Sequence, residues 1–352
     1  MHNFTQTVPI NPLIDYYCKL ILDICMYLSI FIVPLLFYLV FTQSKCIKRY
    51  KYFLMNNIFW CVLLTITFWY CKIHLHFPAA CVHFEPFFPS LPFSSSFAMY
   101  LFTIGIVNVL ASMACTILYR LAHAQMGSLQ YHLDNSKRFY IGFAMFQVIA
   151  SISFMGSLRA IQITDPAEAD AELALRVPHL QNSTVPFICV ASGFPAIFIS
   201  FGASMLLILF AIVGGVMLIM LHKKLMSNKV RLSERTAKLQ FMLFYALSVQ
   251  IVSYYVFELF PLIFDCLGFT VGFVHGEAVT LIMEALTSVH SIVDYICIIY
   301  FIVPYRRAVV KMARRLTRQK IGPRRQSTFS SGVSDAKSNF DLHRRMSKFT
   351  RF

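Results

Sequence analysis

The distribution of apolar residues along this 352-residue chain constrains its fold more than any other feature. Seven stretches are long and apolar enough to cross a bilayer, whose hydrocarbon core needs about 20 residues of helix. A β-barrel would need strands of about half this length with alternating polarity. We therefore expect an all-α membrane protein, a seven-transmembrane helix bundle. The predicted spans are Leu20–Phe41, Phe53–Ile73, Phe97–Tyr119, Phe139–Leu158, Pro195–Leu221, Leu239–Phe264 and Ala278–Val303.

The composition favours a membrane protein over a soluble domain. Hydrophobic residues make up 58% of the chain and charged residues only 13%, so a soluble fold could not keep its apolar surface out of water. The net charge of +15 would indicate nucleic-acid binding in a soluble protein, but the basic residues cluster just outside the predicted spans. No nucleic-acid partner is therefore expected. The ten cysteines form no C-x-x-C pair, so nothing indicates a metal site, a redox motif or a cofactor.

Two independent signals predict the direction in which the chain crosses the membrane. Lys and Arg concentrate in cytoplasmic loops, and here they follow the first, third, fifth and seventh predicted spans. The two N-x-[ST] sequons, which make Asn3 and Asn182 candidate glycosylation sites, fall on the opposite side. We therefore predict a multi-pass protein with an extracellular N-terminus (1–19), a seven-span domain (20–303) and a cytoplasmic C-terminus.

The longest loop between spans, Arg159–Phe194, is acidic and lies on the predicted outer side. It is interpreted either as a solvated, helical lid or as a screen for ligands at the mouth of the bundle. Cys81, in the preceding outer loop, and Cys189, at the end of this one, could form a disulfide that tethers the lid, because extracellular space is oxidising. Cys71 and Cys266 are competing partners, so the sequence leaves the connectivity open.

Ionisable groups inside membrane spans are costly and usually have pairing or functional roles. Proline removes a backbone hydrogen bond and bends a helix, so Pro261 gives the sixth span a natural pivot. In the seventh span Glu277 and Glu284 share one stripe, and His290 and Asp294 share another. An interhelical hydrogen-bond network and direct ligand contact are both open interpretations. The candidates for ligand binding or switching are Gln250, Tyr254, Glu258, Glu284, His290 and Asp294.

Several charged or polar residues lie near the predicted outer boundary. Asp15 and Lys19 are interpreted as an i,i+4 ion pair on the first helix. Lys72, His74 and His76 alternate at the outer end of the second span, where snorkelling to the interface accounts for the lysine.

The predicted cytoplasmic side carries the features that a soluble partner would contact. Residues 304–321 have apolar side chains at helical spacing between arginines, which indicates an amphipathic helix on the anionic inner leaflet. The tail, 322–352, is predicted to be disordered. It presents Ser327 and Ser347 in R-R-x-S sequences as phosphorylation candidates for a kinase, and phosphate there could create a new docking surface. The candidates for coupling to a cytosolic partner are Arg120, Lys223, Lys224, Arg235, Lys238 and Arg306.

Five short motifs, taken in order, resemble those of one receptor family over roughly spans two to seven. They are Leu54-Met55-Asn56-Asn57-Ile58-Phe59-Trp60, Phe77-Pro78-Ala79-Ala80, Lys238-Leu239-Gln240 with Ala246-Leu247-Ser248-Val249-Gln250, Ser288-Val289-His290-Ser291, and Pro304-Tyr305-Arg306. Together with seven spans and an outer N-terminus, they resemble the nematode serpentine chemoreceptors of the Str superfamily, closest to classes H and I, which are G-protein-coupled receptors.

The chain also departs from that family's pattern. Tyr254 stands where a proline is usual, Ser291 stands where a glycine is usual, and Asp294 is an additional acid. At the inner end of the third span, Arg120 lacks the acidic partner of the rhodopsin-like D-R-Y triplet. The inactive-state lock of this chain is therefore expected to differ in its details.

The resemblance implies a chemosensory receptor, not an enzyme, that detects an odorant or pheromone-like small molecule and signals to a heterotrimeric G protein. It also implies that the inner basic residues couple to this G protein, and that a kinase and an arrestin act at the tail. Its implied location is the plasma membrane, a sensory cilium included. The alternatives are a seven-span transporter or an odorant-gated channel. Transporters often contain internal repeats, which we do not find here, and the insect-type odorant channels have the opposite orientation. An intramembrane enzyme would need a catalytic pair, and only His290 and Asp294 are such neighbours.

Overall fold

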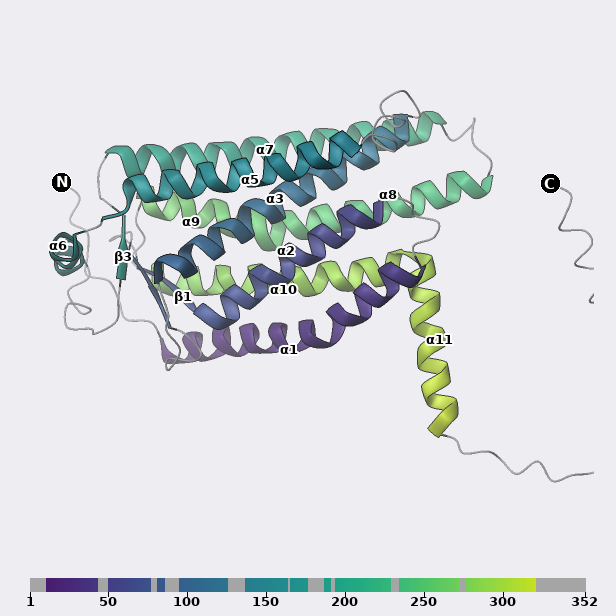
Figure 1. The fold of residues 1–352 in the computed structure, drawn as a ribbon, viewed down its shortest axis with the longest axis horizontal. Coiled ribbons are helices and arrows are strands. Elements are labelled where there is room, and N and C mark those ends of the chain that lie inside the picture. Colours follow the sequence, from purple (N-terminus) through teal and green to yellow (C-terminus); the bar gives the residue numbers. More distant parts are fainter. Residues whose placement is uncertain are drawn as a thin grey trace, which may run out of the picture. The chain divides into compact units, whose positions relative to one another are not determined.

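The computed structural model describes residues 11–43, 50–76, 81–85, 95–125, 137–163, 165–176, 187–190, 194–228, 234–271 and 276–320. The chain divides into two units, Met1–Ala308 and Val309–Phe352. The first unit contains a bundle of seven helices that are long and apolar enough to cross a membrane, which confirms the predicted fold class (Figure 1).

Six of the seven bundle helices are continuous. The remaining one, the sixth in chain order, contains a π-helical turn midway. The continuous helices are α1 (Pro12–Gln43), α2 (Tyr50–Cys71), α3 (Ser95–Gln125), α5 (Lys137–Ile161), α7 (Phe194–Asn228) and α10 (Gly276–Phe301). The interrupted one consists of α8 (Glu234–Tyr254), the π-helical turn η3 (Tyr255–Leu259) and α9 (Phe260–Val271). Two further helices are α6 (Pro166–Arg176), within the acidic loop, and α11 (Val303–Lys320), at the position of the predicted amphipathic helix.

The first helix begins at Pro12 rather than at the predicted Leu20 because its start is capped. The side-chain oxygen of Asn11 accepts a hydrogen bond of 2.9 Å from the backbone N–H of Leu13. Pro12 then occupies the first helical position, where a missing N–H costs nothing. The helix therefore includes Asp15 and Lys19, whose predicted pair is present at 3.0 Å.

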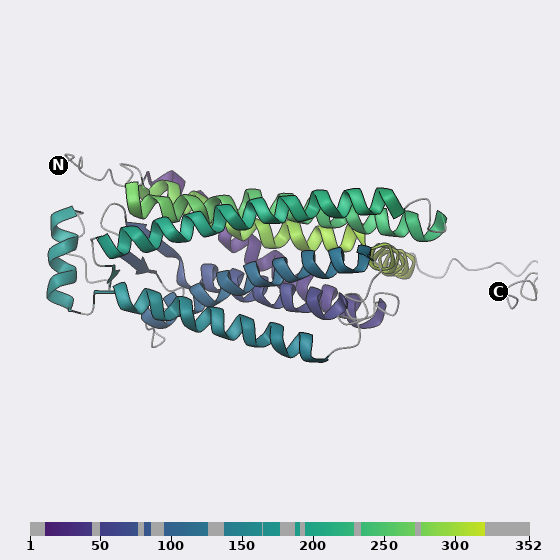
Figure 2. The same cartoon turned by 90° about the horizontal axis from the view of Figure 1, so that it is seen from above.

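The helices differ in how much of their surface lies inside the bundle. In α10, 61% of the most apolar window is buried, whereas in α5 the share is 11%. The peripheral helices expose large apolar side chains, such as Phe146 on α5 and Leu206 on α7. In a membrane, lipid would cover these apolar side chains. The polar residues of α10 are buried and therefore face other helices and not the bilayer. Figure 2 shows the same bundle from above.

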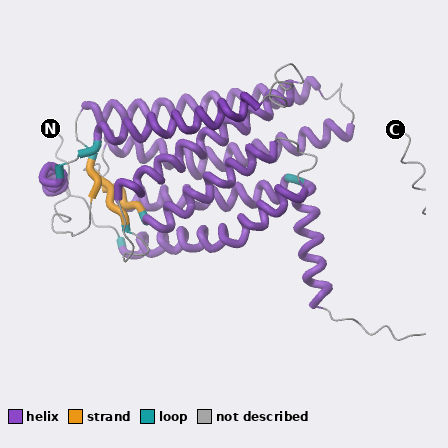
Figure 3. Tube along the Cα trace, in the orientation of Figure 1, coloured by secondary structure: helices purple, strands orange, loops and turns teal. Residues whose placement is uncertain are grey.

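A small antiparallel sheet at one end of the bundle was not predicted. It consists of β1 (Ile73–His76), β2 (Cys81–Phe84) and β3 (Phe187–Cys189), in the order β1-β2-β3 (Figure 3). We call this the sheet end of the bundle. The opposite end, where α7 finishes and α8 starts, is called the basic end.

The sheet corrects the interpretation of the second span. The helix ends at Cys71, and Lys72 takes a left-handed conformation with φ of 41°, which stops helical winding. Ile73, His74 and His76 therefore belong to a strand and not to the membrane helix. The placement of the span end at Ile73 was wrong because the apolar run continues through strand residues without a change in hydropathy.

The π-helical turn lies directly before Pro261, the predicted pivot. The backbone N–H of Phe260 donates to the carbonyl of Tyr255, five residues earlier. This wider turn accommodates a proline that cannot donate its own N–H. The hydroxyl of Tyr255 donates to the Ala211 carbonyl on α7 at 2.8 Å. A side chain at Gly214 would collide with that hydroxyl, so this glycine permits the contact.

Candidate functional site

A buried polar network joins three helices in the middle of the bundle. The Asp294 carboxylate on α10 accepts hydrogen bonds from Gln250 of α8 at 2.7 Å and from Asn57 of α2 at 2.9 Å. All three side chains are buried. At bilayer depth such groups have no water to bind, so each must find a partner in another helix.

A second contact lies one helical turn away from Asp294. The Nδ1 atom of His290 lies 2.8 Å from a carboxylate oxygen of Glu258, which belongs to the π-helical turn. The ring of Tyr254 packs edge-on against His290, with ring centroids 5.5 Å apart. We call these two adjacent sets of contacts on α10 the polar network. It contains five of the six predicted candidates in the last two spans, and the exception is Glu284.

The sixth candidate, Glu284, faces a small pocket instead. It is 3% exposed, and neither of its carboxylate oxygens has a hydrogen-bond partner in the described part of the chain. Two other acids, Glu258 and Asp265, also line this pocket, and each has one buried oxygen without a partner among the described residues. The lining consists of Phe68, Leu75, Phe102, Ile106, Glu258, Leu262, Asp265, Glu284 and Thr287.

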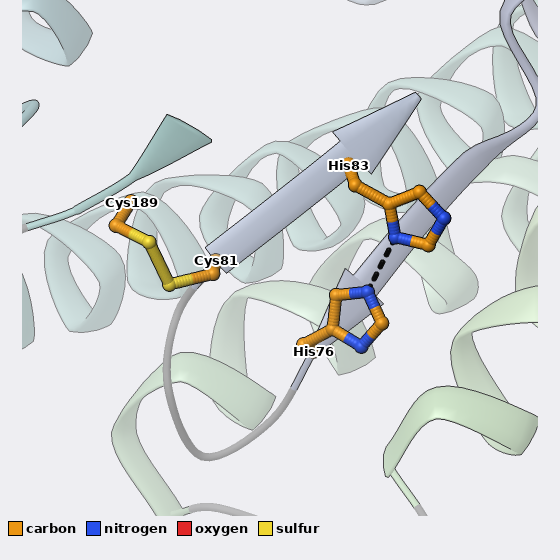
Figure 4. The surroundings of a disulfide bond; sticks show 4 residues. All are labelled: His76, Cys81, His83 and Cys189. Atoms are coloured by element: carbon orange, nitrogen blue, oxygen red, sulfur yellow. Dashed lines mark hydrogen bonds between the residues drawn. A yellow bond between two sulfur atoms is a disulfide. The ribbon is translucent and has the colours of Figure 1, made fainter. Parts of the chain in front are cut away.

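A disulfide and a pair of histidines occupy the sheet end. The structure joins Cys81 of β2 to Cys189 of β3, which are also register partners in the sheet (Figure 4). Cys71 and Cys266, the competing cysteines, are free thiols. On the adjacent strands, the Nε2 atom of His76 lies 2.5 Å from the Nδ1 atom of His83.

The histidine pair continues to the first turn of α10. The Nδ1 atom of His76 lies 2.5 Å from the carboxylate of Glu277. A consistent assignment of protons has His83 donating to His76 and His76 donating to Glu277, with both rings neutral. The sheet is therefore fastened to the start of α10, seven residues before Glu284.

The protonation of this end is set by burial and by neighbouring rings. Burial, together with the neighbouring His74 and His76 rings, lowers the pKa of His83 to about 3. A hydrogen bond from His74 lowers the pKa of Glu85 to about 2, with Lys19 assisting at 2.7 Å. As the pH falls, the cost of keeping His83 unprotonated in the folded chain therefore appears before Glu85 loses its charge.

The predicted coupling residues lie at or beyond the basic end. Lys223 and Lys224 are exposed on α7, and Arg306 of α11 packs over the Tyr300 ring at 5.5 Å. The three remaining residues lie in helices, but their side chains fall outside the described part: Arg120 in α3, and Arg235 and Lys238 in α8. The sites at Asn3, Asn182, Ser327 and Ser347 also lie outside the described residues.

Sequence reasoning missed three participants. Asn57 had a signal, because an amide in the middle of an apolar span must find a partner. Asp265 lies one residue past Phe264, where we placed the end of the sixth span, although α9 continues past it to Val271. The pairing of His76 with His83 depends on strands that the hydropathy pattern did not indicate. Among the described residues, no group of three or more His, Cys, Asp or Glu is arranged to hold a metal ion.

Comparison with known protein families gives one match that covers most of the chain. A family model described as the serpentine type 7TM GPCR chemoreceptor Srh matches residues 15–315. No individual curated protein matches the chain significantly.

Proposed function

The chain belongs to the Srh family of serpentine seven-transmembrane chemoreceptors, and from this premise we propose that it converts small-molecule binding into G-protein activation. The proposed orientation places the sheet end outside the cell and the basic end in the cytoplasm. It rests on the loop charges and the sequons. The disulfide at the sheet end agrees with this orientation, since disulfides persist in oxidising compartments.

One observation carries the proposal: Glu258 belongs both to the pocket and to the polar network. One of its carboxylate oxygens contacts His290, while the other is buried at the pocket without a partner among the described residues. A ligand that contacts the second oxygen would compete with, or reinforce, the first contact. Such a ligand binds two arrangements of the network with different affinity, which is what a population shift requires.

The π-helical turn supplies a place where two arrangements can interconvert. Glu258 lies within this turn, next to Pro261, so a change in its partner acts on a segment that is already irregular. A change in the winding there would alter the position of α8, whose other end contains Arg235 and Lys238. These residues, with Arg120, Lys223, Lys224 and Arg306, form the proposed coupling surface.

The test combines topology and signalling in intact cells. A tag before Asn3 should be reachable by antibody without permeabilisation, whereas a tag after Phe352 should not. A panel of volatiles and small metabolites should then include compounds that trigger dissociation of a co-expressed heterotrimeric G protein. Arg120→Ala should reduce that signal at normal surface expression, and Glu168→Gln, an exposed change on α6, serves as the control.

Two results would count against the proposal. A C-terminal tag found outside the cell would reject the receptor orientation. Ligand-dependent ion or solute flux without G-protein dissociation would favour the channel or the transporter.

A further inference from the structure

We infer that the pocket between α2, α3, α9 and α10 binds a small organic cation, an ammonium group on a short hydrocarbon body. This inference rests on the proposed receptor function and specifies the chemical class of its ligand. It starts from the excess of acid over base around the pocket.

Three carboxyl groups from three elements line this one pocket: Glu258 from η3, Asp265 from α9 and Glu284 from α10. No Lys or Arg belongs to the lining, and the nearest basic partner in the described part is His290, which contacts one oxygen of Glu258. Carboxyl groups removed from water normally lie beside a cation or a set of donors. Among the described residues, one oxygen of Asp265 and both oxygens of Glu284 have no such partner.

Glu284 is the strongest indication that this pocket binds a ligand. It is 97% buried, it lines the pocket, and neither oxygen is bonded within the described part of the chain. Buried acceptors in folded proteins normally have hydrogen-bond donors, so two buried carboxylate oxygens without donors indicate a missing partner. An ammonium group supplies the missing positive charge together with three N–H donors, which matches the number of carboxyl groups that line the pocket.

The remaining wall of the pocket suits the rest of such a ligand. Phe68 of α2 and Phe102 of α3 pack edge to face, with centroids 5.3 Å apart, and both line the pocket. Leu75 of β1 and Leu262 of α9 add apolar surface. Aromatic faces attract ammonium groups and accept hydrocarbon, so the wall favours an amine over a strongly hydrated metal ion. The cavity volume is about 20 Å³, close to that of one or two water molecules, so the ligand can carry little more than the ammonium group and one carbon atom.

The experiment measures binding to the purified full chain in lipid nanodiscs, without a G protein. Methylamine is compared with methanol, which has the same hydrocarbon body without the charge. The readouts are the shift in melting temperature and the dissociation constant from titration, in a background of N-methyl-D-glucamine and again in sodium. Glu284→Gln and Asp265→Asn each replace one carboxyl group with an amide. Asp23→Asn is the matched control, because Asp23 bonds the Trp69 indole on the first two helices and does not line the pocket.

We expect methylamine, and not methanol, to raise the melting temperature of the parent and of Asp23→Asn. Glu284→Gln should weaken amine binding about tenfold or more, as expected for the loss of a charged hydrogen bond. Glu284→Asp, which keeps the charge, should retain part of the affinity.

Three results would overturn the inference: equal binding of alcohol and amine, stabilisation by sodium alone, or amine binding that is unchanged in both charge variants. The comparison of the two ligands on the parent protein decides the matter even if a variant fails to fold. Binding is measured without a G protein, so a failure to bind the amine would not contradict the proposed signalling function. Intact amine binding without signalling would contradict the signalling function but not this inference.

Discussion

The two halves of α10 are held to the rest of the bundle by different kinds of interaction. At the sheet end, Glu277 is fastened to His76 of a three-stranded sheet, and a covalent bond between Cys81 and Cys189 fixes that sheet. In the middle of the helix, Asp294 and His290 depend on hydrogen bonds and one ion pair that span three elements. The first set cannot exchange partners without unfolding the sheet, whereas the second can. The structure therefore suits a fixed frame at the sheet end and an interior whose contacts can be exchanged.

The largest expected effect comes from removing the covalent bond. The disulfide closes a loop with a sequence separation of 108 residues, and loss of a cross-link over a loop of that length costs about 4–5 kcal/mol in the chain-entropy account. Cys81→Ser should therefore lower the melting temperature and the surface level of the full chain strongly. Cys266→Ser, which removes a free thiol, is the control. Equal melting temperatures for the two variants would show that the disulfide contributes little to the stability of the sheet end.

A smaller effect is expected from acid at the sheet end. The pKa of His83 falls from 6.5 to about 3 on folding, so only the unfolded chain binds this proton between those values. Stability is then lost as the pH falls below 6.5, by about 2 kcal/mol at pH 5. Glu85 contributes nothing in this window, because its stabilisation is lost only between 4.5 and about 2. The difference in melting temperature between pH 7 and pH 5 should therefore be smaller for His83→Gln than for the parent. The same pH response in both would remove His83 from the account.

In the exchangeable interior, Asp294→Asn should change function rather than folding. The asparagine keeps one acceptor for Asn57 or Gln250 but loses the other and the charge. Hydrogen bonds between membrane helices contribute about 0.6 kcal/mol on average, so we expect a shift of about threefold in basal or ligand-driven signalling at normal surface expression. Glu234→Gln, an exposed change at the start of α8, controls for removal of a charge. A dose–response curve identical to that of the parent would show that Asp294 has a structural role and takes no part in switching.

The smallest effect should follow from Lys19→Ala. This lysine contacts Asp15 at 3.0 Å and Glu85 at 2.7 Å, but all three side chains are partly or largely exposed. Pairs of this kind contribute about 0–1 kcal/mol. The melting temperature should therefore fall by much less than in Cys81→Ser. A comparable fall would mean that charges rather than the disulfide hold the frame.

The contrast between the two regions also explains what the sequence could and could not predict. The seven spans followed from hydropathy alone, because the cost of burying backbone in lipid leaves few alternatives. Glu258, His290 and Asp294 were identifiable for the same reason, since acids and histidines inside a span must have partners. The identity of those partners, such as Asn57 for Asp294, depends on which helices are neighbours, and residues 237 positions apart leave no local pattern.

The sheet end was harder to predict because its strands are three or four residues long. Ile73–His76 continues the apolar run of α2, and only the left-handed Lys72 separates the two. The sequence pointed to Cys81 and Cys189 but could not exclude Cys71 and Cys266. Strand pairing decides this choice, because it places the α-carbons of Cys81 and Cys189 4.1 Å apart.

The central claim is that the contact between Glu258 and His290 couples the pocket to the basic end, and a double-mutant cycle tests it most directly. Glu258→Gln, His290→Gln and the double variant are expressed at matched surface levels, and basal G-protein activation is measured for each. Because either single change breaks the same contact, the account predicts that the double variant resembles the stronger single variant, with a coupling of about 0.6 kcal/mol or more. Effects that simply add would contradict the account and place the switch elsewhere in the bundle.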